Sequence, residues 1–267
     1  MNTLSKLKGE FLRDRHTDEF DKRVDELRTK IKGLDQLKVR DDVFDEYTLL
    51  GLYKLLSKKW ITAMAGPIST GKEANVYLAD RDGTPVAVKI YLTRTANFKK
   101  MQDYIAADRR FINIGKTRRD VIFAWTRKEF SNLKRTEDAG IPVPHPLVFD
   151  RNVLVMEFLG NGNVAFPQLR IAEIDDYQKT YDEILDHIRT LWKKAKLVHG
   201  DLSEYNILFG NGHPYLIDMG QAVTLDHLNA PGFLKRDLEQ LNRFFSGRCS
   251  VREVSETLEE LCGSSPQ

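Results

Sequence analysis

The sequence predicts an α+β protein of two lobes, because strand-like segments dominate its first half and helix-like segments its second half. Residues 61–67, 75–79 and 85–91 are expected to be strands, and the turn-forming run Asp80-Arg81-Asp82-Gly83 joins the last two into a hairpin. Apolar residues then recur at helical spacing over residues 177–196. With 267 residues, the chain is long enough to bury a large core.

The other expected elements follow from the same patterns. An apolar helical stripe over 46–60 should pack on the first lobe, and a helix over 126–138 should end at Gly140, ahead of three prolines. The remaining elements are a buried strand over 153–158, a hairpin that turns at Gly210-Asn211-Gly212, and helices over 234–245 and 251–261. We expect a charged helical arm at 1–45, an N-terminal lobe at 46–158 with a basic insertion at 93–125, and a C-terminal lobe at 159–267.

Charge and composition exclude several classes of protein. The 41 Lys and Arg nearly balance the 39 Asp and Glu, which argues against strong non-specific binding of nucleic acid by the whole chain. Residues 94–135 nevertheless carry 12 basic and 4 acidic side chains, a local excess of +8. No apolar run approaches the roughly 18 residues that span a membrane, and the start of the chain lacks the apolar segment of a signal peptide. Cys249 and Cys262 are too few for a disulfide framework or a zinc site, so we expect a cytoplasmic protein with no membrane partner.

Residues 66–73, Gly-Pro-Ile-Ser-Thr-Gly-Lys-Glu, nearly match the Walker A phosphate loop G-x-x-x-x-G-K-[ST]. Two features argue against that loop: Glu73 stands where a metal-binding hydroxyl is required, and a strand follows where a helix is required. The alternative is a strand–loop–strand cover over phosphates, G-x-G-x-x-G-x-V. With Val76 as its valine, small residues occupy the three glycine positions: Ser69, Gly71 and Ala74. Small residues let a backbone approach a phosphate.

The side chains of Ser69, Thr70 and Lys72 would add hydroxyl and cationic contacts to that phosphate loop. Taken alone, the loop is also compatible with an ordinary hairpin. The next strand, Val86-Ala87-Val88-Lys89, matches V-A-I-K and would place Lys89 beneath the loop, where it can bridge two phosphates. A lysine among strand hydrophobics needs an anionic partner. Glu129, on the helix about 40 residues later, is the candidate, and a solvated glutamate is the alternative.

Two further motifs carry polar groups at the spacing that phosphoryl transfer needs. Residues 199–206, His-Gly-Asp-Leu-Ser-Glu-Tyr-Asn, match H-x-D-L-x-x-x-N, in which Asp201 would accept the proton of the acceptor hydroxyl and Asn206 would hold a metal ion. Asp218-Met219-Gly220 stands where D-F-G is expected, so Asp218 would be a second metal ligand. The order Lys89, Glu129, Asp201, Asn206, Asp218 is the order found in protein kinases.

Residues 156–159, Met-Glu-Phe-Leu, follow an apolar strand and precede a glycine, as expected of the hinge between two lobes. Backbone groups of Glu157 and Leu159 would bind the adenine edge, and a plain strand end is the alternative. The expected apolar walls around the base are Val76, Ala87 and Met156. Tyr205, beside Asn206, is a further expected nucleotide contact.

Three of these segments resemble the RIO-type atypical serine/threonine protein kinases, in the branch typified by the S-T-G-K-E loop: S-T-G-K-E-A-N-V-Y at 69–77, H-G-D-L-S-E-Y-N at 199–206 and I-D-M-G-Q-A-V at 217–223. The resemblance spans about residues 46–245. It implies a bilobal protein-kinase-like fold, an ATP site with Mg²⁺ or Mn²⁺, autophosphorylation, and a role in maturation of the small ribosomal subunit. It also implies Asp201 as the catalytic aspartate, Asn206 and Asp218 as metal ligands, and an ATPase cycle with an aspartyl-phosphate on Asp218.

The chain departs from ordinary protein kinases after Asp218. There is no room for an activation loop, and Ala230-Pro231-Gly232 imitates A-P-E without its glutamate, so a turn is expected there. The C-terminal catalytic lobe is therefore reduced and lacks the helices that hold a peptide, which favours a switch driven by ATP turnover on an assembly. Because long low-complexity tails are absent, we expect an archaeal source.

The basic stretch lies between the strand of Lys89 and the helix of Glu129, beside the mouth of the cleft. Its basic residues are Arg94, Lys99, Lys100, Arg109, Arg110, Lys116, Arg118, Arg119, Arg127 and Lys128, interleaved with Phe98, Tyr104, Phe111, Phe123 and Trp125. One hypothesis is a rim that contacts the RNA of the small-subunit precursor. The alternative is a solvated helix–loop–helix whose aromatic residues pack on the lobe.

Two other functions compete with the kinase and ATPase. A small-molecule phosphotransferase of kinase-like fold shares the H-x-D-x-x-x-x-N pattern but usually needs a larger helical lobe to enclose its substrate. A non-catalytic ATP-binding scaffold for ribosome assembly is the other, and the presence of all five polar residues argues against it.

Overall fold

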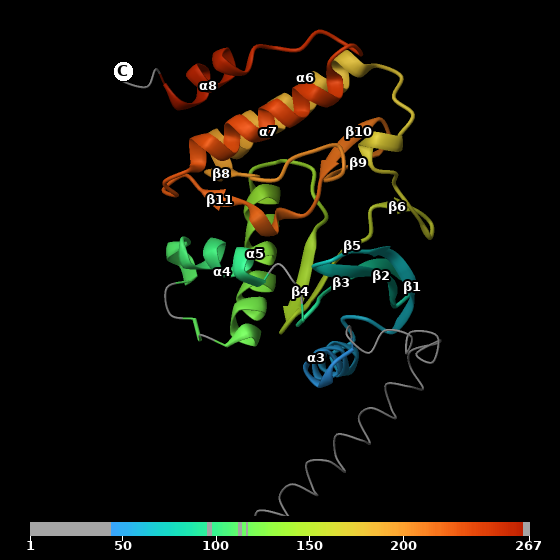
Figure 1. The fold of residues 1–267 in the computed structure, drawn as a ribbon. Coiled ribbons are helices and arrows are strands. Elements are labelled where there is room, and N and C mark those ends of the chain that lie inside the picture. The colour runs from blue at the N-terminus through green and yellow to red at the C-terminus, as the bar shows by residue number, and fades with distance from the viewer. Residues whose placement is uncertain (1–43, 95–97, 112–113, 116, 264–267) are drawn as a thin grey trace, which may run out of the picture.

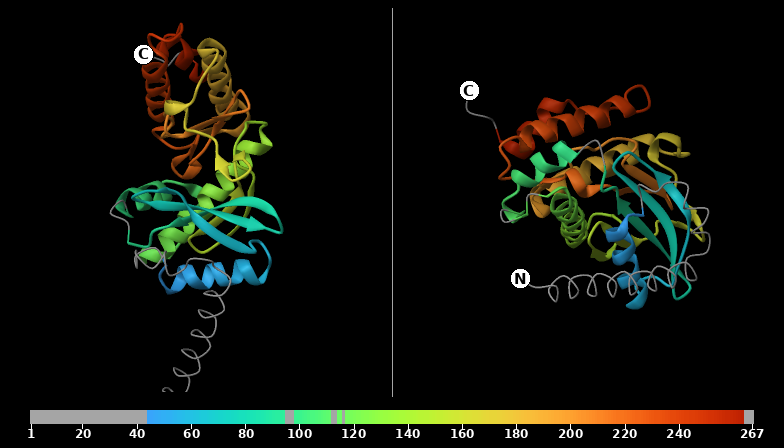
Figure 2. Two further views of the ribbon diagram at one scale, coloured as in Figure 1. Left: turned by 90° about the vertical axis from the view of Figure 1, so that its right-hand side faces the viewer. Right: turned by 60° about the horizontal axis from the view of Figure 1, so that its bottom comes forward.

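The structure is a computed structural model, and it describes residues 44–94, 98–111, 114–115 and 117–263. Two lobes lie one above the other (Figures 1 and 2). The arm expected at 1–45 lies outside the described residues except for Phe44 and Asp45. No helix in the described ranges is long and apolar enough to cross a membrane.

The described part of the N-terminal lobe combines a sheet with several helices. Its elements are α3 (Glu46–Ser57), β1 (Ala63–Thr70), β2 (Ala74–Arg81), β3 (Thr84–Tyr91), α4 (Phe98–Ala106), η1 (Arg109–Phe111), α5 (Arg118–Asp138), β4 (Pro146–Asp150) and β5 (Val153–Glu157). The strands form one antiparallel sheet in the order β1-β2-β3-β5-β4. As predicted, a tight turn joins β2 to β3: Asp82 and Gly83 have φ of 51° and 87°, the left-handed values that a two-residue hairpin turn requires.

The C-terminal lobe is mainly helical. Its elements are β6 (Gly160–Asn161), β7 (Val164–Ala165), η2 (Leu169–Ile171), α6 (Tyr177–Thr190), a π-helical turn η3 (Leu191–Ala195), β8 (Leu197–Val198), β9 (Ile207–Gly210), β10 (His213–Leu216), η4 (Met219–Gln221), β11 (Val223–Thr224), α7 (Ala230–Phe245) and α8 (Val254–Cys262). The segment Ala230-Pro231-Gly232 forms the first turn of α7, so the expected loop turn was wrong. Proline suits the first helical turn, because its missing N–H has no intrahelical partner there.

Strand β3 is buried on both faces, and its side chains alternate between the apolar cluster on one face and the cleft on the other. Val86, Val88 and Ile90 belong to the apolar cluster that includes Leu52 and Leu55 of α3. Ala87, Lys89 and Tyr91 point the other way, into the space between the lobes. The helix α3 therefore covers the outer face of the sheet and leaves the inner face for the site.

Helix α5 runs alongside the sheet from the N-terminal lobe toward the C-terminal lobe (Figure 1). It begins at Arg118, two turns before the predicted start at residue 126, because Thr117 and Asp120 form a capping box. Met101 and Ile105 of α4 and Trp125 of α5 share one apolar cluster, so the basic insertion is folded onto α5.

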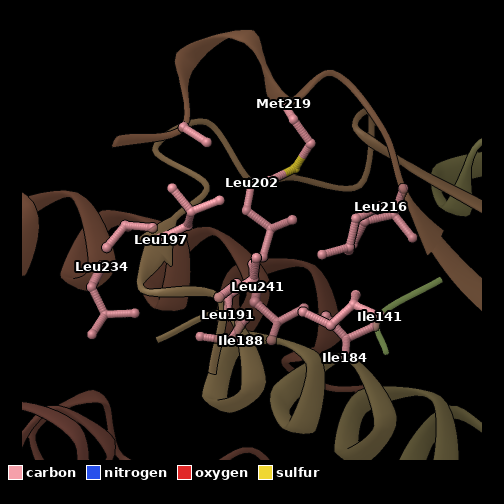
Figure 3. Packing of buried hydrophobic residues seen from close by; sticks show 14 of the residues in the cluster. Ile141, Ile184, Ile188, Leu191, Leu197, Leu202, Leu216, Met219, Leu234 and Leu241 are labelled. Atoms are coloured by element: carbon pink, nitrogen blue, oxygen red, sulfur yellow. The ribbon is translucent and has the colours of Figure 1, made fainter. Parts of the chain in front are cut away.

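The C-terminal lobe is organised around one apolar core in which α6 packs against α7 and against the segments between them (Figure 3). Ile184 of α6 and Leu216 of β10 are 0% exposed in this core. Met219 of η4 is also 0% exposed, so the segment after Asp218 is anchored in the core of this lobe.

We predict that Ile184→Ala will lower the free energy of unfolding by about 3 kcal/mol, because it leaves a cavity in a core that cannot close around it. Urea titration followed by circular dichroism measures the change. Ile171→Ala is the matched control, since Ile171 is 61% exposed and the same substitution there should have little effect. Equal losses in the two variants would contradict this description of the core.

Candidate active site

A cleft of about 580 Å³ lies between the lobes and is bounded by the sheet, by α5 and by residues of β9 and η4. The residues predicted for the site that line it are Ser69, Gly71, Lys72, Val76, Ala87, Lys89, Glu129, Met156, Glu157, Leu159, Asp201, Tyr205, Asn206 and Asp218. Thr70 is the one member of the predicted set outside this lining, and it is exposed at the end of β1.

Strand register brings the expected apolar walls onto one face. Val76 lies opposite Lys89, and Ala87 lies opposite Met156. Residues directly opposite in antiparallel strands point to the same side of the sheet. The cleft also contains apolar residues to which the sequence motifs assign no role, among them Ile68, Leu133, Leu208 and Ile217.

The loop between β1 and β2 is a tight connection that leaves little room for a side chain at Gly71. The Gly71 N–H donates to the Asn75 side-chain oxygen at 3.1 Å and to the Ala74 carbonyl at 3.0 Å. A Cβ on Gly71 would lie 3.0 Å from that carbonyl. The one glycine that remains from the G-x-G-x-x-G pattern therefore stands where a side chain would crowd the backbone.

Lys89 forms two ion pairs in the cleft. Its Nζ donates to Oε1 of Glu129 at 2.7 Å and to Oδ1 of Asp218 at 3.0 Å. Glu129 also accepts a hydrogen bond from the Tyr91 hydroxyl. Tyr91 was missed in the sequence, where it is simply the last apolar residue of a strand. This network joins the sheet, α5 and the segment before η4.

Burial and charge act in opposite directions on these groups. Burial alone would lower the pKa of Lys89, but the carboxylates of Asp218 and Glu129 outweigh it and raise the pKa above its ordinary value. Burial would raise the pKa of Asp218, yet the Lys89 ammonium lowers it. The pKa of Glu129 is raised, because burial dominates there. Lys89 and Asp218 therefore remain charged at neutral pH.

Asp201 is held by side-chain amides. Its Oδ2 accepts from Nε2 of Gln221 at 3.0 Å and from Nδ2 of Asn206 at 3.3 Å. Nδ2 of Asn206 also donates to the Asp201 carbonyl at 2.8 Å, which turns the amide nitrogen of Asn206 toward Asp201 and its oxygen away from it. The backbone N–H groups of Gly200 and Leu202 donate to the buried carboxylate of Asp237 at 2.7 and 3.0 Å.

Asp218 occupies an unusual backbone position. Its φ of 62° is left-handed, a conformation that aspartate tolerates better than most residues. Just before it, the carbonyl of Ile217 accepts a hydrogen bond from Nε2 of His199 at 3.0 Å. The side chain of Asp218 is 48% exposed, so its carboxylate is open to the cleft although its backbone is fixed.

The donor set fits a magnesium ion bound together with phosphates. No group of three or more His, Cys, Asp or Glu side chains among the described residues is placed to hold a metal ion. Of the predicted site residues, Asn206 would offer an amide oxygen and Asp218 a carboxylate. Mg²⁺ prefers one or two carboxylates plus phosphate oxygens over a complete protein cage. When bound, it would neutralise charge on the β- and γ-phosphates.

The basic stretch is divided by the fold. Lys128 is 0% exposed, so its assignment to the basic rim was wrong; its ammonium is turned inward to backbone carbonyls of Gly220 and Ala222. Burial lowers the pKa of Lys128 to about 7. The exposed members of the stretch are Arg94, Lys99, Lys100, Arg109, Arg118, Arg119 and Arg127. Arg110 is half-buried against Asp108 at 2.6 Å, and Lys116 lies outside the described residues.

Besides Tyr91, sequence reasoning missed two polar contributors to the site, Gln221 and Asp237. Gln221 stands in the segment I-D-M-G-Q-A-V, three residues after Asp218, but no motif assigned it a role. Asp237 lies on α7 at helical spacing among apolar residues, and a charge in the buried stripe of a helix is the signal that would have identified it.

Comparison with known proteins agrees with this geometry. The family model described as RIO1, RIO domain, matches residues 75–258. The RIO-type serine/threonine-protein kinase Rio1 of Haloferax volcanii is 45% identical over 87% of this chain and 80% of its own length. The human serine/threonine-protein kinase RIO1 is 36% identical over 88% of this chain, which spans 43% of that protein.

The fold is likewise that of a solved RIO structure. The crystal structure of the Rio2 kinase–ADP/Mg²⁺–phosphoaspartate complex from Chaetomium thermophilum superposes with a TM-score of 0.61 over 82% of this chain and 67% of that chain, at 22% identity. This confirms the predicted bilobal kinase-like architecture. Together, the motifs, the cleft and these similarities show that the chain belongs to the RIO1-type serine/threonine protein kinases.

Proposed function

We propose that this kinase uses ATP with Mg²⁺ or Mn²⁺ to phosphorylate itself on serine or threonine, and that it also turns over ATP through an aspartyl-phosphate on Asp218. The observation that carries the proposal is the convergence of Lys89, Asp201, Asn206 and Asp218 on one cleft. These groups supply a phosphate-binding cation, a proton acceptor and two oxygen ligands.

The positions of these groups support transfer of the phosphoryl group to a hydroxyl. Lys89 holds the phosphates, and the backbone around Gly71 covers them. Asp201 accepts the proton of the attacking hydroxyl while the oxygen–phosphorus bond forms and the bond to the leaving ADP breaks. Because Oδ2 of Asp201 already accepts from Gln221 and Asn206, we assign the role of proton acceptor to Oδ1.

The aspartyl-phosphate has a separate support. The Rio2 kinase of C. thermophilum was solved with ADP, Mg²⁺ and a phosphoaspartate. In this chain, Asp218 is half-exposed to the cleft and its pKa is lowered by Lys89, so it is an ionised nucleophile that needs no base. Its attack would form an acyl phosphate and release ADP. Water would then cleave the phosphorus–oxygen bond, with Asp201 accepting the proton, and would restore the carboxylate.

We further propose that the kinase acts in the cytoplasm during maturation of the small ribosomal subunit. The resemblance to the RIO kinases suggests this assembly, and the exposed basic side chains of α4, η1 and α5 support it as a surface that RNA phosphates would contact. The half-buried aromatic residues Phe98 and Tyr104 pack against the apolar cluster that lies beneath this surface.

Substitutions of the two aspartates should distinguish phosphoserine or phosphothreonine from the aspartyl-phosphate. With labelled ATP and Mg²⁺, the wild type should carry an acid-stable label on serine or threonine and a hydroxylamine-sensitive label. Asp218→Asn should lose the hydroxylamine-sensitive label. Asp201→Asn should lower the acid-stable label by about 10²–10⁴-fold, the usual contribution of a general base, and should retain the acyl phosphate.

Asp226→Asn is the matched control for both substitutions, since Asp226 is 46% exposed and lies outside the cleft lining. Chelation of the metal ion with EDTA should abolish both labels. Hydroxylamine-sensitive label that survives in Asp218→Asn would exclude the aspartyl-phosphate, and a wild type that transfers no phosphate would exclude the proposed activity.

RNA binding should depend on salt through the basic surface. Each phosphate contact contributes roughly 0.7–0.9 to the slope of log affinity against log salt concentration. Reversing the charges of Lys99, Lys100, Arg109 and Arg118 should therefore flatten the slope for a small-subunit RNA fragment by about 3. Filter binding at several salt concentrations measures the slope.

The matched control reverses the charges of four exposed lysines of the C-terminal lobe: Lys193, Lys194, Lys196 and Lys235. It should leave the slope nearly as in the wild type. Equal flattening by both sets would show that overall charge, rather than this surface, governs RNA binding.

A further inference from the structure

Helix α5 presents two polar side chains to the interior of the molecule. Lys128 and Asn132, one turn apart, are both 0% exposed. A charged or amide group deprived of water destabilises a fold unless it is hydrogen-bonded. The hydrogen-bond partners of Lys128 and Asn132 therefore show which part of the structure α5 stabilises.

Both side chains donate hydrogen bonds to the same backbone segment, residues 219–222. Nζ of Lys128 donates to the carbonyl of Gly220 at 2.7 Å and to the carbonyl of Ala222. Nδ2 of Asn132 donates to the carbonyls of Met219 at 2.8 Å and Ala222 at 3.1 Å. Three carbonyls within the segment 219–222 thus accept from α5.

The segment also packs closely against the helix at Gly220. A Cβ on Gly220 would lie 3.0 Å from the indole nitrogen of Trp125, so the backbone touches α5 directly. The ammonium of Lys128 also lies 5.3 Å from the centre of the Trp125 ring and 5.8 Å from that of Tyr104, within the range of cation–π attraction.

The segment 219–222 is connected at its two ends to the carboxylates of Asp218 and Asp201. Asp218 directly precedes it. At the other end, Gln221 donates to Oδ2 of Asp201 at 3.0 Å. A shift of the segment relative to α5 would therefore displace the metal ligand and the proton acceptor together.

We infer that Lys128 and Asn132 are positioning residues that set the place of both Asp218 and Asp201 through this one backbone segment. The inference rests on the roles proposed above for the two aspartates. Neither Lys128 nor Asn132 lines the cleft, so each acts through the segment and not on the nucleotide.

The test uses Lys128→Met and Asn132→Leu in the full chain, with Lys134→Met as the matched control. Lys134 is an exposed lysine of the same helix. Three quantities are measured for each: affinity for a fluorescent ADP analogue without metal, Mn²⁺ affinity of the protein–ADP complex by electron paramagnetic resonance, and kcat for autophosphorylation.

We expect both variants to bind metal-free ADP within about twofold of the wild type, since the sheet and hinge are untouched. Mn²⁺ affinity should fall at least tenfold, and kcat should fall by about 10²-fold, as displacement of a reacting group by about 1 Å commonly does. Gln221→Leu should lower kcat similarly and leave Mn²⁺ affinity unchanged, because it frees Asp201 alone.

Two results would overturn the inference. One is Mn²⁺ affinity and kcat within twofold of the wild type in both variants. The other is a parallel loss of metal-free ADP affinity, which would show general damage to the fold. Asp218→Asn separates this inference from the proposed function: if it leaves Mn²⁺ affinity unchanged, the metal role of Asp218 fails, whatever Lys128→Met does.

Discussion

A buried ammonium is the constraint on which the rest of this structure depends. Lys89 is 6% exposed, and a charge so removed from water is tolerated only beside opposite charge. One partner carboxylate is that of Glu129 on α5, and the other is that of Asp218, just before η4. Asp218 lies more than one hundred residues after Lys89 in the sequence. The sheet, α5 and the C-terminal lobe thus have to meet at one nitrogen atom, and the cleft forms around that meeting point.

Helix α5 can serve both lobes because neighbouring residues on a helix point about 100° apart. Glu129 faces the sheet and Lys89, whereas Lys128 faces the backbone after Asp218. The two side chains are adjacent in sequence, opposite in charge and buried, yet each has its own partners. A helix with two buried polar faces leaves only its outer side for solvent, which is where the exposed arginines Arg119 and Arg127 lie.

The site was more predictable than the contacts that position it. Lysine, aspartate and asparagine at fixed spacing were recognisable because phosphoryl transfer requires those chemical groups, and the bilobal kinase fold followed from them. Lys128 was misassigned because a run of basic residues does not indicate which one turns inward; its acceptors lie 92 and 94 residues away. The start of α5 was misplaced because local capping by Thr117 and Asp120 overrides weak apolar periodicity.

The connection between Asp218 and α7 limits how this kinase can be controlled. Residues 219–229 include η4 and β11, and β11 pairs with β8, so the segment is tied to the lobe as far as Thr224. Ordering of a long loop by phosphorylation requires a loop that is free to be disordered. Here the segment directly after Asp218 is held by hydrogen bonds from α5 on one side and by the C-terminal core on the other. The position of Asp218 is therefore fixed by contacts within the described fold and does not depend on a loop that becomes ordered on phosphorylation.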